Sequence, residues 1–266
     1  MHPIERLRYV ARSSGVDVST LIHETSAGLG PITNDPVELV TACRRVVSRH
    51  PFVGPLWWLC SRVLCAADAR REAWLAASEF DTDATFEELD YALADAAVVC
   101  TIGWPDFIGA ALARRGDIRS FIVDANGEGA ALVRRLCRAD NDSVEVRPVG
   151  MAAAVLASTV VLIECSVMGP DGCIALVGAR ALAATAKSCG VPVYLVAETG
   201  CAMPELTWRY ITAKLDADRP WDSDEELVPA DLFDGVIGPR GVESFDVAAA
   251  HTTCPVAHEL LKDVAF

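Results

Sequence analysis

From Ala96 onward, short apolar runs alternate with stretches of helical periodicity. The apolar runs lie at residues 97–102, 118–123, 144–146, 160–163, 191–196 and, less clearly, 232–237. The helical stretches between them lie at residues 107–115, 129–138, 152–158 and 179–188. Strands buried on both faces are apolar throughout, and strands that alternate with helices pair in parallel through right-handed crossovers. Residues 95–266 are therefore predicted to form a Rossmann-like α/β domain, with a mainly parallel sheet flanked by helices.

The first 94 residues have a different pattern and predict a helical N-terminal domain. Asp35 and Pro36 are a typical helix start, and Leu39, Cys43 and Val46 follow at helical spacing. Further helices are predicted at residues 56–67, at 71–80 and from Thr85, whose first turn is acidic. The predicted organisation is thus residues 1–94 for the helical domain and 95–266 for the sheet domain, which would contain the ligand cleft.

The charge of the chain excludes some classes of partner. Its 23 Lys and Arg residues against 37 Asp and Glu give a net charge of −14, whereas nucleic-acid binding and binding to acidic membranes need a basic face. The N-terminus has no apolar signal core, and the longest apolar run, at 155–163, is far too short to span a membrane. We expect a cytoplasmic protein with no nucleic-acid or membrane partner.

Ten cysteines are present, and none is spaced as CxxC. Most lie in apolar or helical stretches, which favours buried, reduced thiols over disulfides or metal ligands. His251, Cys254 and His258 could be three ligands of a metal, but a closed zinc site needs four. No metal site and no cofactor is predicted.

A ligand site is predicted at the carboxyl ends of the strands, because open parallel sheets bind ligands there. Those ends are residues 100–104, 124–129, 164–172 and 197–203. The chain has neither GxGxxG after a strand nor a GxxxxGK motif, so the two commonest nucleotide-binding loops are absent. Residues 216–231, rich in Asp, Glu and Pro, are predicted to form a mobile acidic loop.

Several features near these ends have two readings. The Gly-Pro-Asp-Gly segment at 169–172 is either a ligand-contacting loop or a plain tight turn. The acid pairs Asp124 with Glu128 and Glu164 with Asp171 could serve as acid and base, although acidic rim loops are expected in so acidic a chain. Trp57 and Trp58 could form a partner-facing patch, but we favour one ring in the core and its neighbour partly exposed.

The segment 160–199, VVLIECSVMGPDGCIALVGARALAATAKSCGVPVYLVAET, resembles the eukaryotic initiation factor 2B-like family. The family has a strand, a Gly-rich loop, a helix and a "GxPxYxxAET" strand in this order. The segments Arg49-His50-Pro51 and Arg62-Val63-Leu64 are similar to its N-terminal "RPT…RVL" helix pair, and residues 228–232 with Gly241 to its closing "TPPELI…E.G" segment. The family includes the alpha, beta and delta regulatory subunits and isomerases of methylthioribose-1-phosphate and ribose-1,5-bisphosphate.

At the isomerases' catalytic positions this chain departs from the pattern. Ile102 stands where their "THCN" motif has cysteine, and Ser166 stands where their "GAD" motif has aspartate. Serine does not titrate near neutral pH, so it cannot replace the aspartate as acid or base. Asn126 replaces the phosphate-clamping arginine of "ETRPxxQG", and Ala175-Leu176 replaces the Asn-Lys of "NKxGT". Only a two-residue slip, which keeps the side-chain face, would bring Cys100 to the cysteine position.

The resemblance and these departures together imply a non-catalytic initiation factor 2B-like protein, a homodimer or the partner of a related subunit. It is expected to bind a sugar phosphate or a nucleotide and to act through oligomer or partner contacts. One alternative is an isomerase-like enzyme of altered chemistry that uses Asp124, Glu164 or Asp171; the other is a structural subunit with an empty cleft. No catalytic residue is assigned. The expected ligand contacts are Gly103, Asp124, Asn126, Gly129, Ser166, Asp171, Gly172, Gly178 and Glu198.

Overall fold

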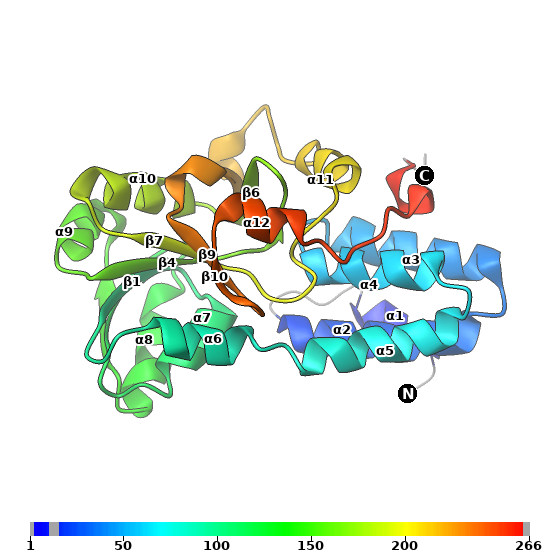
Figure 1. The fold of residues 1–266 in the computed structure, drawn as a ribbon, viewed down its shortest axis with the longest axis horizontal. Coiled ribbons are helices and arrows are strands. Elements are labelled where there is room, and N and C mark those ends of the chain that lie inside the picture. The colour runs from blue at the N-terminus through cyan, green and yellow to red at the C-terminus, as the bar shows by residue number, and fades with distance from the viewer. Residues whose placement is uncertain (1–2, 11–15, 263–266) are drawn as a thin grey trace.

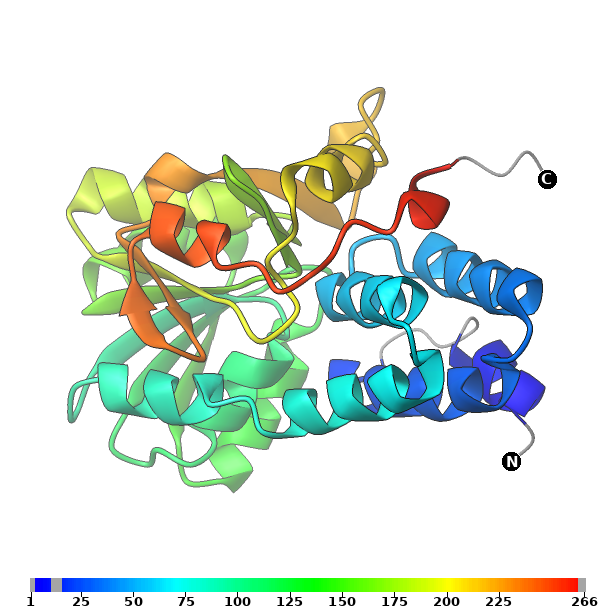
Figure 2. The same ribbon diagram turned by 45° about the vertical axis from the view of Figure 1, so that its right-hand side comes forward.

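The computed structural model describes residues 3–10 and 16–262, beginning with a run of helices (Figures 1 and 2). Aspartates start several of them: Asp17, Asp35 and Asp68 each accept hydrogen bonds from backbone N–H groups of the first turn. The predicted start at Asp35 and Pro36 is confirmed. These helices are α1 (Pro3–Val10), α2 (Val18–Leu29), α3 (Pro36–Arg49), α4 (Gly54–Cys65), α5 (Ala69–Asp81) and α6 (Thr85–Ala92).

The second part is built on a seven-stranded sheet of order β10-β9-β7-β4-β1-β2-β3. All neighbours pair in parallel except β10, which pairs antiparallel to β9, so the predicted mainly parallel sheet is confirmed. Its strands are β1 (Val98–Ile102), β2 (Arg119–Val123), β3 (Asp142–Val146), β4 (Val160–Glu164), β7 (Val193–Val196), β9 (Gly235–Gly238) and β10 (Gly241–Glu243).

Helices cover both faces of this sheet and bury its apolar side chains in two separate cores (Figure 1). On one face lie α6, α7 (Asp106–Leu112) and α8 (Gly129–Arg138), which contribute Leu89, Leu112 and Leu136 to one core. On the other lie α9 (Met151–Leu156), α10 (Ala179–Cys189) and α12 (Phe245–Ala250), which contribute Val155 and Leu182 to the other. Although α6 falls within the predicted helical domain, it packs against the sheet.

A second, three-stranded antiparallel sheet corrects one prediction. Its strands are β5 (Val167–Met168), β6 (Gly172–Leu176) and β8 (Glu225–Pro229), in the order β5-β6-β8. The expected mobile acidic loop at 216–231 is wrong over β8, which pairs along all of β6. The apolar Val228 of this acidic segment is fully buried, and β6 supplies the backbone partners that local composition does not reveal.

The helices α2 to α5 share a core with elements from the end of the chain. Trp57 and Trp58 on α4 are both fully buried there, so the expected partial exposure of one ring is wrong. The Trp57 ring meets Tyr210 of α11 (Glu205–Thr212) edge to face, and the Trp58 Nε1 donates to Thr253 Oγ1 at 2.9 Å. The closing turn η5 (His258–Leu261) also returns to these helices, where Leu260 is buried (Figure 2).

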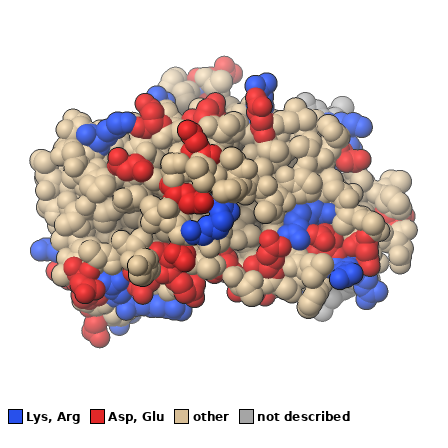
Figure 3. Space-filling view, viewed as in Figure 1, with Lys and Arg blue, Asp and Glu red and all other residues tan. Residues whose placement is uncertain are grey.

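The surface carries charges of both signs. On the face seen in Figure 3 the basic side chains form small groups that lie beside acidic ones. Of the ten cysteines, seven are buried, Cys189 is half-buried, and Cys65 and Cys137 are exposed. In the described part of the chain, no helix has both the length and the apolar character needed to cross a membrane.

Candidate functional site

The strand order reverses between β1 and β4. From β1 the chain winds outward through β2 and β3, and from β4 it winds the other way through β7 and β9. The crossover connections diverge at this point and leave a crevice beyond the carboxyl ends of the two strands, where ligands bind in open α/β sheets. A cavity of about 250 Å³ lies there, with Ile102 of β1 and Glu164 of β4 in its wall. We call it the switch-point cavity.

Both parts of the molecule contribute to this cavity. Phe52 and Val53 come from the connection into α4, Pro55 from α4 and Val18 from α2, and the remaining wall comes from the strands, loops and helices of the sheet part. The segments meet closely, since the Gly54 N–H donates to the Ser166 carbonyl at 2.9 Å. The lining residues are Val18, Phe52, Val53, Pro55, Ile102, Trp104, Pro105, Asp106, Glu128, Ile163, Glu164, Cys165, Ser166, Leu176, Ala179, Glu198 and Glu225.

Glu164 closes the N-terminus of α7. Its two carboxylate oxygens accept from the backbone N–H groups of Asp106, Phe107 and Ile108 at 3.0, 2.9 and 2.9 Å. Burial raises the pKa of Glu164 to about 7; the nearby Asp106 charge adds to this, and the three N–H donors oppose it. The side chain thus satisfies the donors that a helix start leaves open.

Two other helices at this edge of the sheet are closed in the same way. Asp124 accepts from the Gly129 N–H at the start of α8, at 2.8 Å. Glu226 accepts from the Gly178 and Arg180 N–H groups at the start of α10, at 2.6 and 2.9 Å. Helix N-termini are common phosphate sites because their free N–H groups and dipoles attract anions. Here the donors are bonded to carboxylates of the chain itself.

Glu198 and Glu225 add two more carboxylates to the cavity wall. Burial raises the pKa of Glu225 to about 7, opposed by the Ser166 hydroxyl, whose Oγ lies 3.4 Å from Glu225 Oε2. Burial also raises the pKa of Glu198 well above its ordinary value, and the charges of Glu164, Asp83 and Asp106 add to the shift. The described lining residues include no Lys, Arg or His, so nothing in the wall neutralises this acidity.

The two positions that the resemblance aligns with the isomerases' cysteine and aspartate lie in this wall. Ile102 and Ser166 both line the cavity, whereas Cys100 lies deeper on the same face of β1 and is fully buried. Burial raises the pKa of the Cys100 thiol to about 12, which keeps it in the unreactive thiol form at neutral pH. The deeper thiol does not replace the missing cysteine.

Of the nine expected ligand contacts, Ser166 and Glu198 line the cavity. Gly103 and Gly178 have positive φ angles of 70° and 94°, and a Cβ on them would lie 2.2 Å from the Leu176 side chain and 2.7 Å from that of Ile102. Both glycines are therefore required by the turns that lead out of the strands. Asp124 and Gly129 are bonded to each other as described above.

The other expected contacts make bonds within the chain. Asn126 has a positive φ of 58° and donates to Asp224 Oδ1 at 3.3 Å. Gly172 lies in β6, where an added Cβ would lie 2.5 Å from the Val228 carbonyl oxygen. Asp171 accepts from Trp208 Nε1 at 2.6 Å. The 169–172 segment is the turn between β5 and β6, and it places Asp171 against α11.

We expect Asp171→Ala to lower the free energy of unfolding by about 1–2 kcal/mol, because the buried Trp208 N–H loses a charged acceptor. Chemical denaturation checks this value, and tryptophan emission checks the surroundings of the ring. Asp222→Ala is the matched control, because Asp222 forms an ion pair with the exposed Arg219, and this substitution should change stability by less than about 0.5 kcal/mol. Equal effects of the two substitutions would contradict a structural role for Asp171.

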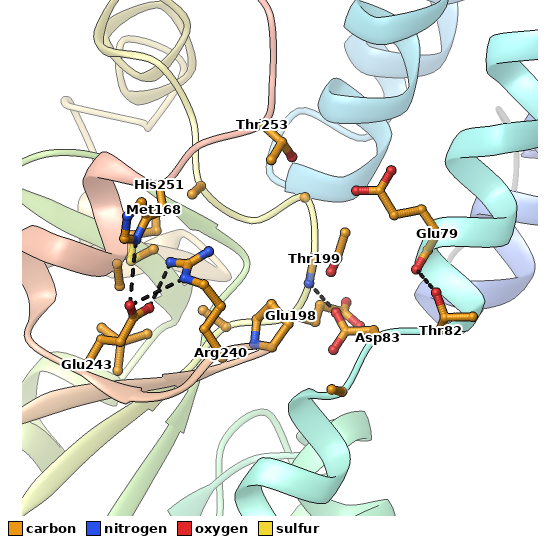
Figure 4. Close-up of a pocket in the computed structure, with 18 residues that line it drawn as sticks. Glu79, Thr82, Asp83, Met168, Glu198, Thr199, Arg240, Glu243, His251 and Thr253 are labelled. Carbon is orange, nitrogen blue, oxygen red and sulfur yellow. Dashed lines mark hydrogen bonds and ion pairs between the residues drawn. The ribbon is translucent and has the colours of Figure 1, made fainter.

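A second cavity, of about 300 Å³, lies beside β7 and β9 and shares Glu198 with the first (Figure 4). Glu243 organises one side of it, where Arg240 donates to Glu243 Oε2 at 2.7 Å and His251 Nδ1 lies 3.6 Å from Glu243 Oε1. On the other side Asp83 accepts from the Thr199 N–H. Figure 4 shows Glu198 beside Asp83, between these two groups.

The His251, Cys254 and His258 group does not form a ligand set. His251 faces Glu243, and the Cys254 thiol lies 3.6 Å from the Pro255 carbonyl oxygen. Among the residues that the structure describes, no three His, Cys, Asp or Glu side chains are placed to hold a metal ion.

The cavity wall contains side chains that sequence reasoning did not indicate. Phe52 and Val53 reach the cavity from the helical part, which no strand-end rule would indicate. Glu225 reaches it from β8, within the segment that was expected to be a loop. In the sequence, the one sign of strand β8 was the segment at 228–232, which is similar to the closing motif of the resembling family. That similarity did not indicate that the segment belongs to a sheet.

No protein-family model matches this chain, and no curated protein matches it in sequence. Solved structures match its fold. The translation initiation factor eIF-2B of Pyrococcus horikoshii OT3 superposes with a TM-score of 0.74 and 13% sequence identity, over 91% of this chain and 96% of that one. This chain has an eIF2B-like fold.

Two structures from Chaetomium thermophilum agree. The match to eIF2B beta has a TM-score of 0.69 and 14% identity, over 91% of this chain and 88% of that one. The match to a chain of the tetrameric eIF2B-beta2-delta2 complex has a TM-score of 0.71 and 14% identity, over 93% of this chain and 92% of that one. The eIF2B-like fold therefore covers the helices as well as the sheet, as the resemblance predicted.

Proposed function

We propose that this chain is a non-catalytic eIF2B-like protein that acts through contacts with a second copy or a related subunit. The observation that carries the proposal is the pair Ile102 and Ser166 in the wall of the switch-point cavity. An isomerase of the resembling family needs a thiol and a carboxylate at these two positions, and neither residue supplies a titratable group. The subunit contacts are supported by eIF2B neighbours that occur in an oligomeric complex.

The ligand expected from sequence, a sugar phosphate or a nucleotide, has little support from the charges of the cleft. Asp124, Glu164 and Glu226 are bonded to the helix N-termini that a phosphate would use. A phosphate dianion in the switch-point cavity would also face Glu198 and Glu225, with no cation in the described wall. We therefore propose that the chain neither binds a phosphorylated ligand in this cleft nor catalyses the isomerase reaction.

An enzyme of altered chemistry is the second candidate. Glu225 has a pKa of about 7 and faces the cavity, and an acid–base catalyst works best with a pKa near the working pH. Against this, the other carboxylate with a pKa of about 7, Glu164, is bonded by three backbone N–H groups and is not free to transfer a proton.

We expect the purified chain to sediment as a dimer at micromolar concentration and to isomerise neither methylthioribose-1-phosphate nor ribose-1,5-bisphosphate. Sedimentation velocity gives the assembly, and product detection gives the turnover, with a working isomerase of the family as positive control. Turnover of any pentose phosphate would contradict this proposal and support the second candidate, an enzyme of altered chemistry. If the chain is a monomer at all concentrations, contacts with a second copy are ruled out. Contacts with a related subunit would then remain, and co-purification would test them.

A further inference from the structure

The switch-point cavity is lined by carboxylates and by apolar side chains. Asp106, Glu128, Glu164, Glu198 and Glu225 face it, and the described lining has no basic side chain. Buried carboxylates are normally paired with cations or hydrogen-bond donors, because an isolated buried charge is very unfavourable. Among the described residues, Glu128 and Glu198 are the two of these carboxylates whose side chains have no hydrogen-bond donor, and unpaired carboxylates suit a cation from outside the chain.

Of these two, Glu128 is exposed and Glu198 is half-buried. No described residue donates a hydrogen bond or forms an ion pair with its side chain, whereas Glu164 has three backbone donors and Glu225 has the Ser166 hydroxyl. Protein surrounds Glu198 on nearly all sides, and the surface it keeps faces the two cavities. Its carboxylate oxygens are therefore available to bind a ligand in the cavities.

Apolar and aromatic side chains also line the cavity, among them Trp104, whose Nε1 donates to Asp106 Oδ1 at 2.9 Å and whose ring has the Arg135 guanidinium 5.9 Å from its centroid. Phe52 and Trp104 line the cavity together with Ile102, Ile163 and Leu176. Aromatic rings attract organic cations through their faces, and apolar walls hold the hydrocarbon part of a ligand. A bare metal ion would not use such a wall, and within residues 3–10 and 16–262 no three candidate ligands are placed to hold one.

We propose that the switch-point cavity binds a small organic cation, a protonated amine with an apolar body, whose ammonium group contacts Glu198 and whose body lies against Phe52 and Trp104. This site is independent of the assembly proposed above, and its ligand is opposite in charge to a sugar phosphate. Binding would keep Glu198 ionised. Because burial and like charges raise the pKa of Glu198 in the free protein, the bound amine would displace a proton from it.

The charges that act on Glu198 come from several elements. Glu164 at the end of β4, Asp106 of α7 and Asp83 before α6 raise its pKa. Glu128 and Glu225 also face the switch-point cavity. In the second cavity Glu79, Arg240, Glu243 and His251 face the same side chain, and the Arg240 guanidinium is bonded to Glu243. Acidic neighbours dominate, which favours a positive ligand.

The test is calorimetric binding of benzylammonium, with benzyl alcohol as the neutral isostere and inorganic phosphate as the anion. We expect saturable binding of benzylammonium, at least tenfold weaker binding of the alcohol, and no binding of phosphate. Titrations in two buffers of different ionisation enthalpy should show proton release on binding, and the affinity should rise with pH. Glu198→Gln should weaken benzylammonium binding at least tenfold, since it removes the charge but keeps the shape.

Glu205→Gln is the matched control, because it removes the same charge from an exposed position on α11 outside both cavities. It should bind benzylammonium like the unchanged protein. Equal binding by the Glu198→Gln variant, equal binding of the alcohol, or no binding of benzylammonium would each overturn the proposal. Sedimentation and turnover on the same preparations report separately on the proposed function.

Discussion

Replacing Trp57 by alanine is expected to lower the free energy of unfolding by about 3–5 kcal/mol, the usual loss for deleting a fully buried large aromatic side chain. The indole is completely buried, its Nε1 donates to the Pro51 carbonyl at 2.9 Å, and its ring meets Tyr210 at a centroid distance of 5.9 Å. Alanine leaves a cavity, an unbonded carbonyl and no contact to α11. Urea unfolding followed by circular dichroism measures the loss.

Trp74→Ala is the control for this experiment. Trp74 lies on α5 in the same group of helices, but 66% of its surface is exposed. Its removal should change the free energy of unfolding by no more than about 0.5 kcal/mol. A small effect at Trp57 together with a large one at Trp74 would mean that α4 is not at the centre of the packing described here.

The Trp57 experiment also tests how the two parts of the molecule are joined. Tyr210, Trp208 and Ile211 belong to α11, which lies between β7 and β8 in sequence but packs into the core of the helical part. If this core holds the parts together, Trp57→Ala should shift the helical and sheet signals in a single transition. Two separate transitions would show that the parts unfold independently.

The sequence predicted the main sheet well because its information is local. The strands at 98–102 and 119–123 lie within segments predicted as strands, and the helix at 129–138 has the predicted bounds. The signals for these elements lie within each segment: apolar continuity for strands, capping residues and periodicity for helices. Right-handed crossovers then fix the parallel pairing.

The candidate site was only partly predictable because its wall depends on distant pairings. Strand β8 forms against β6, about fifty residues earlier, and this pairing brings Glu225 to the cavity. The role of Glu164 was likewise hidden, since its partners are backbone N–H groups of α7, 56 to 58 residues away in sequence. The sequence marked it as an acid at a strand end and could not show that its oxygens are already bonded.

The pH dependence of stability offers a direct test of how Glu164 is held. Its folded pKa of about 7 is higher than its ordinary value of 4.5, so the native state binds this proton more tightly than the unfolded chain. The corresponding stability is fully present below about pH 4.5 and is lost as pH rises through 7. At 1.36 kcal/mol per pKa unit, the full change is roughly 3 kcal/mol.

Glu164→Gln removes the titration and keeps an oxygen acceptor for the start of α7. We expect the free energy of unfolding of the unchanged protein to fall between pH 4.5 and 8 by roughly 3 kcal/mol more than that of the variant. Urea titrations at five pH values measure both curves, with Glu205→Gln as a control that should follow the unchanged protein. Parallel curves for all three proteins would mean that the backbone N–H groups keep Glu164 ionised throughout. The switch-point cavity would then carry a permanent buried negative charge, which would strengthen its preference for a cation and leave proton release to Glu198 alone.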